Sequence, residues 1–145
     1  MRAEEYLSLA VDHGYDEGRA LPLLLQVCLS SSRLRAALDH AEPYLREHPD
    51  AEALRYLVAN IHVGLGQSSE ARVELEQLLR ANPESGDAHY LLGVLDSDGD
   101  VDSARAHFRS YLDVAPKGAH APEVRSRLAE LAIRQDQHLT ARVRR

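Results

Sequence analysis

The sequence predicts an all-α protein, an α-solenoid of stacked antiparallel helix hairpins with about eight helices. Three prolines end similar segments and lie 34 and then 33 residues apart, and an alanine precedes each proline by twelve residues. Upstream of each alanine, apolar residues recur at spacings of three, four and seven, which is typical of one face of a helix. The prolines are Pro49, Pro83 and Pro116, and the alanines are Ala37, Ala71 and Ala104.

Each unit is expected to fold as a helix, a short turn, a second helix and a proline. The predicted units are residues 17–50, 51–85 and 86–118, and runs of Ser, Gly and Asp supply their turns. The small alanines allow the two helices of a hairpin to approach closely. The prolines end the second helix because proline cannot continue it. One hairpin cannot bury its apolar face alone, so neighbouring hairpins are expected to stack.

This pattern resembles the tetratricopeptide repeat, which places aromatic residues, Leu-Gly, Ala, Phe and Pro over about 34 residues. The resemblance covers roughly residues 18–118. Leu21, Leu54 and His89 stand at the first large position in place of Trp, and the third unit alone keeps both Gly93 and Phe108. The array is therefore a divergent one, with a mainly aliphatic core.

A further helix is expected on each side of the repeats. Within residues 1–16, Tyr6, Leu9, Ala10 and His13 fall on one helical face. An alternative interpretation makes residues 14–20 the turn of an extra, degenerate repeat. On the other side, Pro122 suits the first turn of a capping helix over residues 119–138.

A basic tail is expected over residues 139–145, which contain Arg142, Arg144 and Arg145. Clustered arginines can attract phosphate or an acidic partner. The alternative that we favour is a solvated, frayed terminus.

Composition excludes several classes of protein. The chain has 145 residues and a net charge of −6, which argues against a free-standing nucleic-acid binder. No apolar run approaches the roughly 20 residues that a membrane helix needs. Residues 1–5 lack the apolar core of a signal peptide, which predicts a cytoplasmic protein. Arginine far outnumbers lysine, which suggests a bacterial source, and the single Cys28 is expected to be a buried apolar residue.

No motif indicates catalysis, a cofactor or a metal site. The stretch Asp96–Asp100 resembles part of a calcium loop, but Gly99 and His107 stand where such a loop needs other residues, and the stretch suits an inter-helix turn. The eight histidines lack metal-ligand spacing. The sequence therefore favours a protein that is not an enzyme.

The resemblance to tetratricopeptide repeats implies a groove, lined by the first helix of each unit, that binds a peptide or helix from another protein. We expect an adaptor or scaffold subunit. The alternative is a small cytoplasmic secretion chaperone, which would form a homodimer through its terminal helices. By position, the groove residues are Gln26, Leu29, Glu52, Arg55, His62, Asp87, Tyr90 and Val94.

Overall fold

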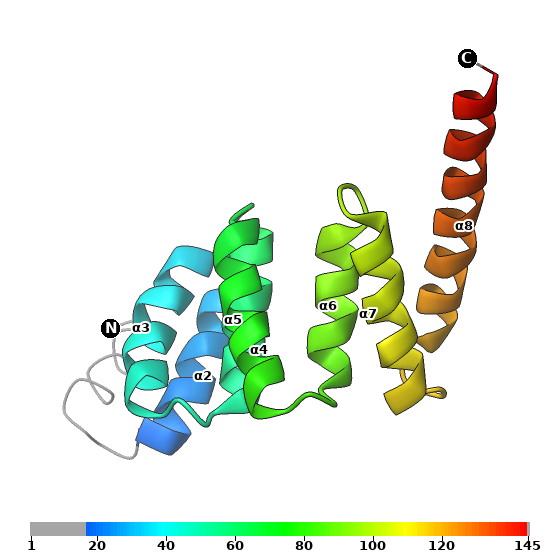
Figure 1. Ribbon diagram of the computed structural model, residues 1–145. Coiled ribbons are helices and arrows are strands. Elements are labelled where there is room, and N and C mark those ends of the chain that lie inside the picture. The colour runs from blue at the N-terminus through cyan, green and yellow to red at the C-terminus, as the bar shows by residue number, and fades with distance from the viewer. Residues whose placement is uncertain (1–16, 145) are drawn as a thin grey trace. The chain divides into compact units, whose positions relative to one another are not determined.

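The computed structural model describes residues 17–144, and this part of the chain is entirely helical apart from turns and loops (Figure 1). Its seven helices occupy the segments that the repeat pattern predicts, which confirms the expected fold class. The additional helix expected within residues 1–16 lies outside the described residues. The helices are α2 (Glu17–Ser30), α3 (Leu34–Glu47), α4 (Glu52–Gly64), α5 (Ser68–Ala81), α6 (Gly86–Asp96), α7 (Val101–Val114) and α8 (Ala121–Val143).

The chain forms two compact units, Met1–Glu74 and Leu75–Arg145, so that α5 contributes to both. In the first unit, α2 packs against α3 and α3 packs against α4. Ala37 and Ala41 are buried in the core that these helices enclose, together with Leu24, Cys28 and Val58. The small side chains on α3 let the neighbouring helices come close, as the spacing of the alanines predicts.

Tight turns join the helices of the first unit at the predicted breaks. After α2, Ser32 adopts a positive φ of 54°, and after α4, Gly66 has a φ of +73°. This left-handed conformation costs glycine little because it has no Cβ. The α2 helix already includes residues 17–20, so the alternative interpretation that made residues 14–20 a turn is wrong for these four positions.

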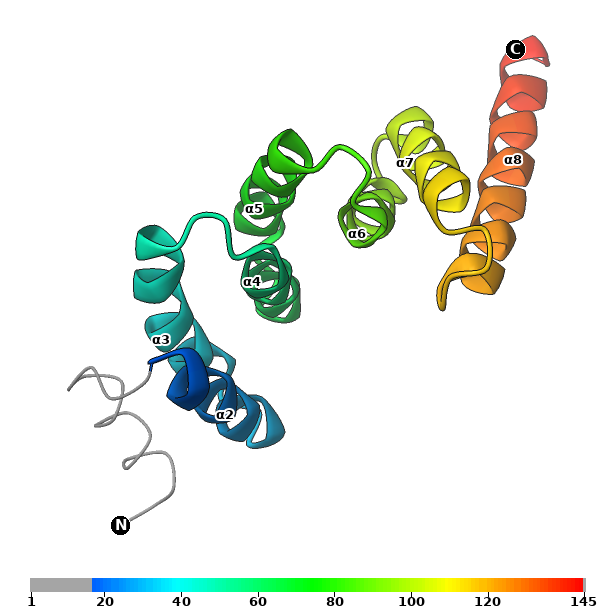
Figure 2. The ribbon, with the colours of Figure 1, turned by 90° about the horizontal axis from the view of Figure 1, so that it is seen from below.

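The second unit is built on the α6–α7 hairpin, against which α8 packs. Figure 2 shows α7 lying between α6 and α8, in agreement with the contacts of α7 with both helices. Gly93 on α6 faces the ring of Phe108 on α7, and a Cβ at this position would meet two ring carbons at 2.6 Å. The pair thus explains why the third unit keeps both Gly93 and Phe108.

Side-chain caps begin two helices of this unit. Ser85 accepts a hydrogen bond from the Ala88 amide, and Asp100 accepts one from the Ser103 amide. Each cap satisfies a backbone donor that the first turn of a helix leaves unpaired.

The last helix, α8, differs from its prediction at one end. Pro122 lies in its first turn as expected, but the helix continues to Val143. Residues 139–143 therefore extend the capping helix, although the sequence analysis assigned them to a separate basic tail. None of the helices within residues 17–144 combines the length and the apolar character that would be needed to cross a membrane.

Candidate functional site

An apolar groove lies on the first unit, between the helices α2 and α4. Its volume is about 700 Å³, and one residue of α3 contributes to its lining. The lining residues are Leu21, Pro22, Leu25, Gln26, Leu29 and Ser30 from α2, Tyr44 from α3, Ala51 from the loop, and Glu52, Ala53, Leu54 and Leu57 from α4.

The chemistry of the groove is dominated by leucine. Leu29, Leu54 and Leu57 are only partly buried and pack against the core of the first unit. Gln26, Ser30 and Glu52 supply polar side chains among the lining residues. A concave apolar surface with a few polar groups is typical of a binding site, since apolar area left in water is stabilised when a ligand covers it.

Three of the residues predicted from the sequence meet in this groove. Gln26 and Leu29 come from α2, and Glu52 comes from the first turn of α4. The sequence analysis missed Tyr44, and it missed Leu54 and Leu57 because their apolar character at core spacing indicated full burial. No simple signal in the sequence separates a leucine that is covered from one that forms the wall of a groove.

Two other predicted residues of α4 lie in the interior of the first unit. Arg55 is 8% exposed and His62 is 7% exposed. The Arg55 guanidinium donates to a Glu74 carboxylate oxygen at 2.6 Å and to the Pro49 carbonyl at 3.0 Å. His62 contacts the Gln67 side chain at 2.9 Å. Both residues thus hold α4 to its surroundings, and their role in binding a partner stays a prediction.

The predicted residues of α6 belong to the second unit. Tyr90 stacks on the His120 ring at a centroid distance of 3.9 Å, and its hydroxyl donates to Glu123 at 3.0 Å. Val94 packs against the core of this unit, whereas Asp87 is exposed in the first turn of α6.

The Glu123 carboxylate in this cluster favours its charged form. A hydrogen bond from Arg127 and a weaker contribution from the Tyr90 hydroxyl lower the pKa of Glu123 below its usual value. The hydrogen bond to Glu123 holds the Tyr90 side chain against the start of α8, and His120 covers one face of its ring.

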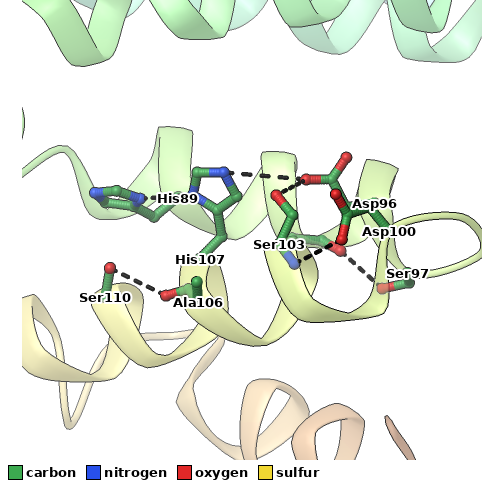
Figure 3. A network of polar contacts seen from close by, with 9 residues as sticks. His89, Asp96, Ser97, Asp100, Ser103, Ala106, His107 and Ser110 are labelled. Carbon is green, nitrogen blue, oxygen red and sulfur yellow. Dashed lines mark hydrogen bonds and ion pairs between the residues drawn. The ribbon is translucent and has the colours of Figure 1, made fainter. Parts of the chain in front are cut away.

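A polar network joins α6 to α7 along one side of their hairpin (Figure 3). The His89 Nε2 lies 2.9 Å from the Pro83 carbonyl, and the two Nδ1 atoms of His89 and His107 lie 3.0 Å apart. Because a carbonyl only accepts, His89 donates through Nε2 and, when neutral, accepts from His107 through Nδ1. The histidine pair therefore acts as a hydrogen-bonded link between the two helices.

The acidic stretch that begins at Asp96, the last residue of α6, belongs to the same network. The buried Asp96 carboxylate accepts from the Ser103 hydroxyl at 2.7 Å, and Asp100 caps α7. Two carboxylates of the stretch that resembles a calcium loop thus accept hydrogen bonds from within the hairpin. Among the residues that the structure describes, no three His, Cys, Asp or Glu side chains gather as a metal site would require.

Stacked helix hairpins with an apolar groove define a helical-repeat protein, and comparisons with known proteins identify the repeat. The sequence profile of the tetratricopeptide repeat family matches residues 29–95. This stretch belongs to that family, which confirms the resemblance found in the sequence. Repeats of this family are in general protein–protein interaction modules. A comparison with curated proteins finds no match.

Solved structures show the same fold over nearly the whole chain. A tetratricopeptide repeat protein from Parabacteroides merdae ATCC 43184 is 22% identical, with a TM-score of 0.78 over 98% of this chain. The chain spans 59% of the length of that protein. MamA (residues 41 to the end) from Desulfovibrio magneticus RS-1 is 20% identical, with a TM-score of 0.76 over 95% of this chain and 77% of its own. These similarities confirm an α-solenoid of helix hairpins.

Proposed function

We propose that this protein binds a segment of another protein in the apolar groove of its first unit, as a non-catalytic adaptor or scaffold subunit. The observation that carries the proposal is the groove of about 700 Å³ between α2 and α4, with its leucine walls and its few polar groups. Tetratricopeptide repeats are interaction modules, and a groove between first helices suits the insertion of a peptide or helix.

The chemistry of the groove suggests the kind of segment that it accepts. Leu29, Leu54 and Leu57 offer apolar contact area, which favours a partner that inserts two or three large apolar side chains. Gln26 and Glu52 can hydrogen-bond with the backbone or with polar side chains of the partner. A groove of this size supports moderate, reversible binding, because the free energy gained by burying apolar area is largely offset by the entropy lost in ordering a peptide.

The other predicted residues take different parts in this proposal. Arg55 and His62 fix the position of α4 and so preserve the shape of the wall. Asp87, Tyr90 and Val94 provide a second contact surface on α6, with the Tyr90 ring held in place by His120.

The proposal places the protein in the cytoplasm, without a nucleic-acid partner, in line with its net charge of −6. The chaperone alternative depends on a homodimer through the terminal helices, and residues 1–16 lie outside the described part of the chain. No feature of the described residues favours that alternative over the adaptor.

Selection from a displayed library of random peptides, with the full chain as bait, tests the proposal. Enriched peptides should share two or three large apolar residues and should bind in a fluorescence anisotropy titration. Ala53→Arg places a cation in the groove at an exposed position of α4 and should weaken their binding at least tenfold.

Ala106→Arg is the matched control, because Ala106 is an exposed alanine on the helix α7 of the second unit. This variant should bind the selected peptides as the parent does, and both variants should keep the parent's helical circular dichroism. Selected peptides that bind equally well to the Ala53→Arg variant would contradict a role for the groove.

A further inference from the structure

The C-terminal part of α8 exposes a second apolar surface, on the other unit. Ile133 is 58% exposed, Leu139 is 55% exposed and Val143 is 86% exposed. Every residue from Asp136 to Arg144 is exposed, and Figure 1 shows this end of α8 extending beyond the α6–α7 turn. Three turns of helix thus hold large apolar side chains in water.

Past Leu131, α8 faces the α6–α7 turn with polar side chains as far as His138. Arg105 on α7 donates to the Gln135 side chain, and Arg134 lies 3.8 Å from Asp98 in the α6–α7 turn. Further along, the Thr140 hydroxyl bonds to carbonyls of its own helix. The buried stripe that anchors α8 ends at Leu131, so the apolar residues beyond it do not belong to the core.

The exposed apolar residues share one face of the helix. At 100° per residue, Leu139, Ala132, Val143 and Ile133 fall within an arc of about 120°. In projection down the helix axis, Arg144 falls about 20° beyond Ile133 at one edge of this arc, and Arg142 about 60° beyond Leu139 at the other. Asp136 lies inside the arc and is its one acidic residue.

The charges of this segment select the kind of partner. Residues 132–144 contain three arginines and one aspartate, in a chain whose net charge is −6. A second copy of α8 is disfavoured, because two copies of this segment would bring six arginines together with two aspartates in any register. A membrane surface is disfavoured by Asp136, whose carboxylate would be buried with the apolar face at a high desolvation cost.

We propose that the exposed face of α8 over residues 132–144 docks an acidic amphipathic helix of a partner protein. Apolar residues of the partner cover Ile133, Leu139 and Val143, while its carboxylates flank Arg142 and Arg144. A polar residue of the partner faces Asp136. This surface lies on the second unit and does not depend on the proposed groove of the first.

Two synthetic helical peptides with the same leucine spacing, one flanked by glutamate and the other by lysine, test the proposal by fluorescence anisotropy. The full chain should bind the glutamate peptide at least tenfold more tightly than the lysine peptide. The preference should largely disappear at about 1 M salt, where the screening length falls to about 3 Å.

Variants locate the binding on α8. Arg142→Glu together with Arg144→Glu should weaken binding of the glutamate peptide at least tenfold, and Leu139→Ser should weaken it severalfold. The matched controls reverse two exposed arginines of α3, Arg35→Glu with Arg46→Glu, and replace the exposed Val73 of α5 by serine. The controls, and Ala53→Arg in the groove, should bind as the parent does.

Four results would overturn the proposal. The first is equal binding of the two peptides, or no binding of either one. The second is unchanged binding by the α8 variants when their circular dichroism matches the parent. The third is a dimer in sedimentation equilibrium that Leu139→Ser dissociates. The fourth is tighter binding to vesicles of phosphatidylglycerol than to the glutamate peptide.

Discussion

Replacing Gly93 by alanine tests whether the α6–α7 hairpin depends on close approach. The new Cβ would lie 2.6 Å from the Cδ1 and Cε1 atoms of Phe108 and 3.0 Å from its Cζ. Carbon atoms pack best at about 3.5–4.0 Å, so the ring must move by most of an ångström. Phe108 is fully buried at 0% exposure, which leaves its ring little space to move.

Two opposing contributions decide how much Gly93→Ala changes the free energy of unfolding. Overpacking a core costs about 1–3 kcal/mol, and a clash with a fully buried ring belongs at the upper end, about 3 kcal/mol. Alanine is a better helix former than glycine by about 1 kcal/mol. The net expectation is a loss of about 2 kcal/mol in the free energy of unfolding, or about 4–8 °C in Tm for a chain of this length.

Urea and thermal denaturation of the full chain, followed by circular dichroism, measure this loss. Gly99→Ala is the matched control, because a Cβ at Gly99 meets nothing within 4 Å. Phe108→Leu should cost less in the Gly93→Ala background than alone, giving a coupling of about 1 kcal/mol or more. A Gly93→Ala variant as stable as the parent, or strictly additive effects, would refute the steric account.

Three further predictions concern other parts of the chain. Gly66→Ala should lower the stability by about 1 kcal/mol in urea denaturation, because an alanine Cβ disfavours the φ of +73°, and a neutral result would contradict this. Arg55→Met should lower the free energy of unfolding by about 2–3 kcal/mol, because the half-buried Glu74 carboxylate loses the guanidinium that lies 2.6 Å from it. Arg35→Met on the surface of α3 should lower it by less than about 0.5 kcal/mol, and equal losses would refute a stabilising buried ion pair. The pKa of Glu123 is lowered in the folded protein, so its hydrogen bonds stabilise the fold above the usual pKa of 4.5, and this stabilisation is lost as the pH falls through the lower folded-state pKa. Glu123→Gln should therefore flatten the acid limb of the curve of unfolding free energy against pH, and an unchanged acid limb would count against this linkage.

The sequence predicts the hairpins because the repeat imposes the same demands in each unit. Ala37, Ala71 and Ala104 are all fully buried, at the positions where close helix approach requires a small side chain. The second helix of each unit ends two residues before its proline, at Glu47, Ala81 and Val114. Proline alone does not end a helix, since Pro43 lies inside α3. These are local rules, so a single sequence suffices to apply them.

The candidate groove is less predictable, because exposure depends on contacts between distant residues. Arg55 and His62 have polar side chains at positions that suggest a surface, yet Glu74 and Gln67 pair with them and allow their burial. Leu54 and Leu57 show the reverse, since they have core spacing but remain partly exposed in the groove wall. The partners that allow the burial of His62 and Arg55 lie 5 and 19 residues away in the sequence.

The most direct test of the central claim is to map a library-selected peptide onto the chain by amide chemical shifts in NMR. Binding in the groove predicts the largest shifts at Gln26, Leu29, Glu52 and Ala53, with the amides of α8 unchanged. Largest shifts on α8, or shifts spread evenly over both units, would contradict the claim that the groove between α2 and α4 is the binding site.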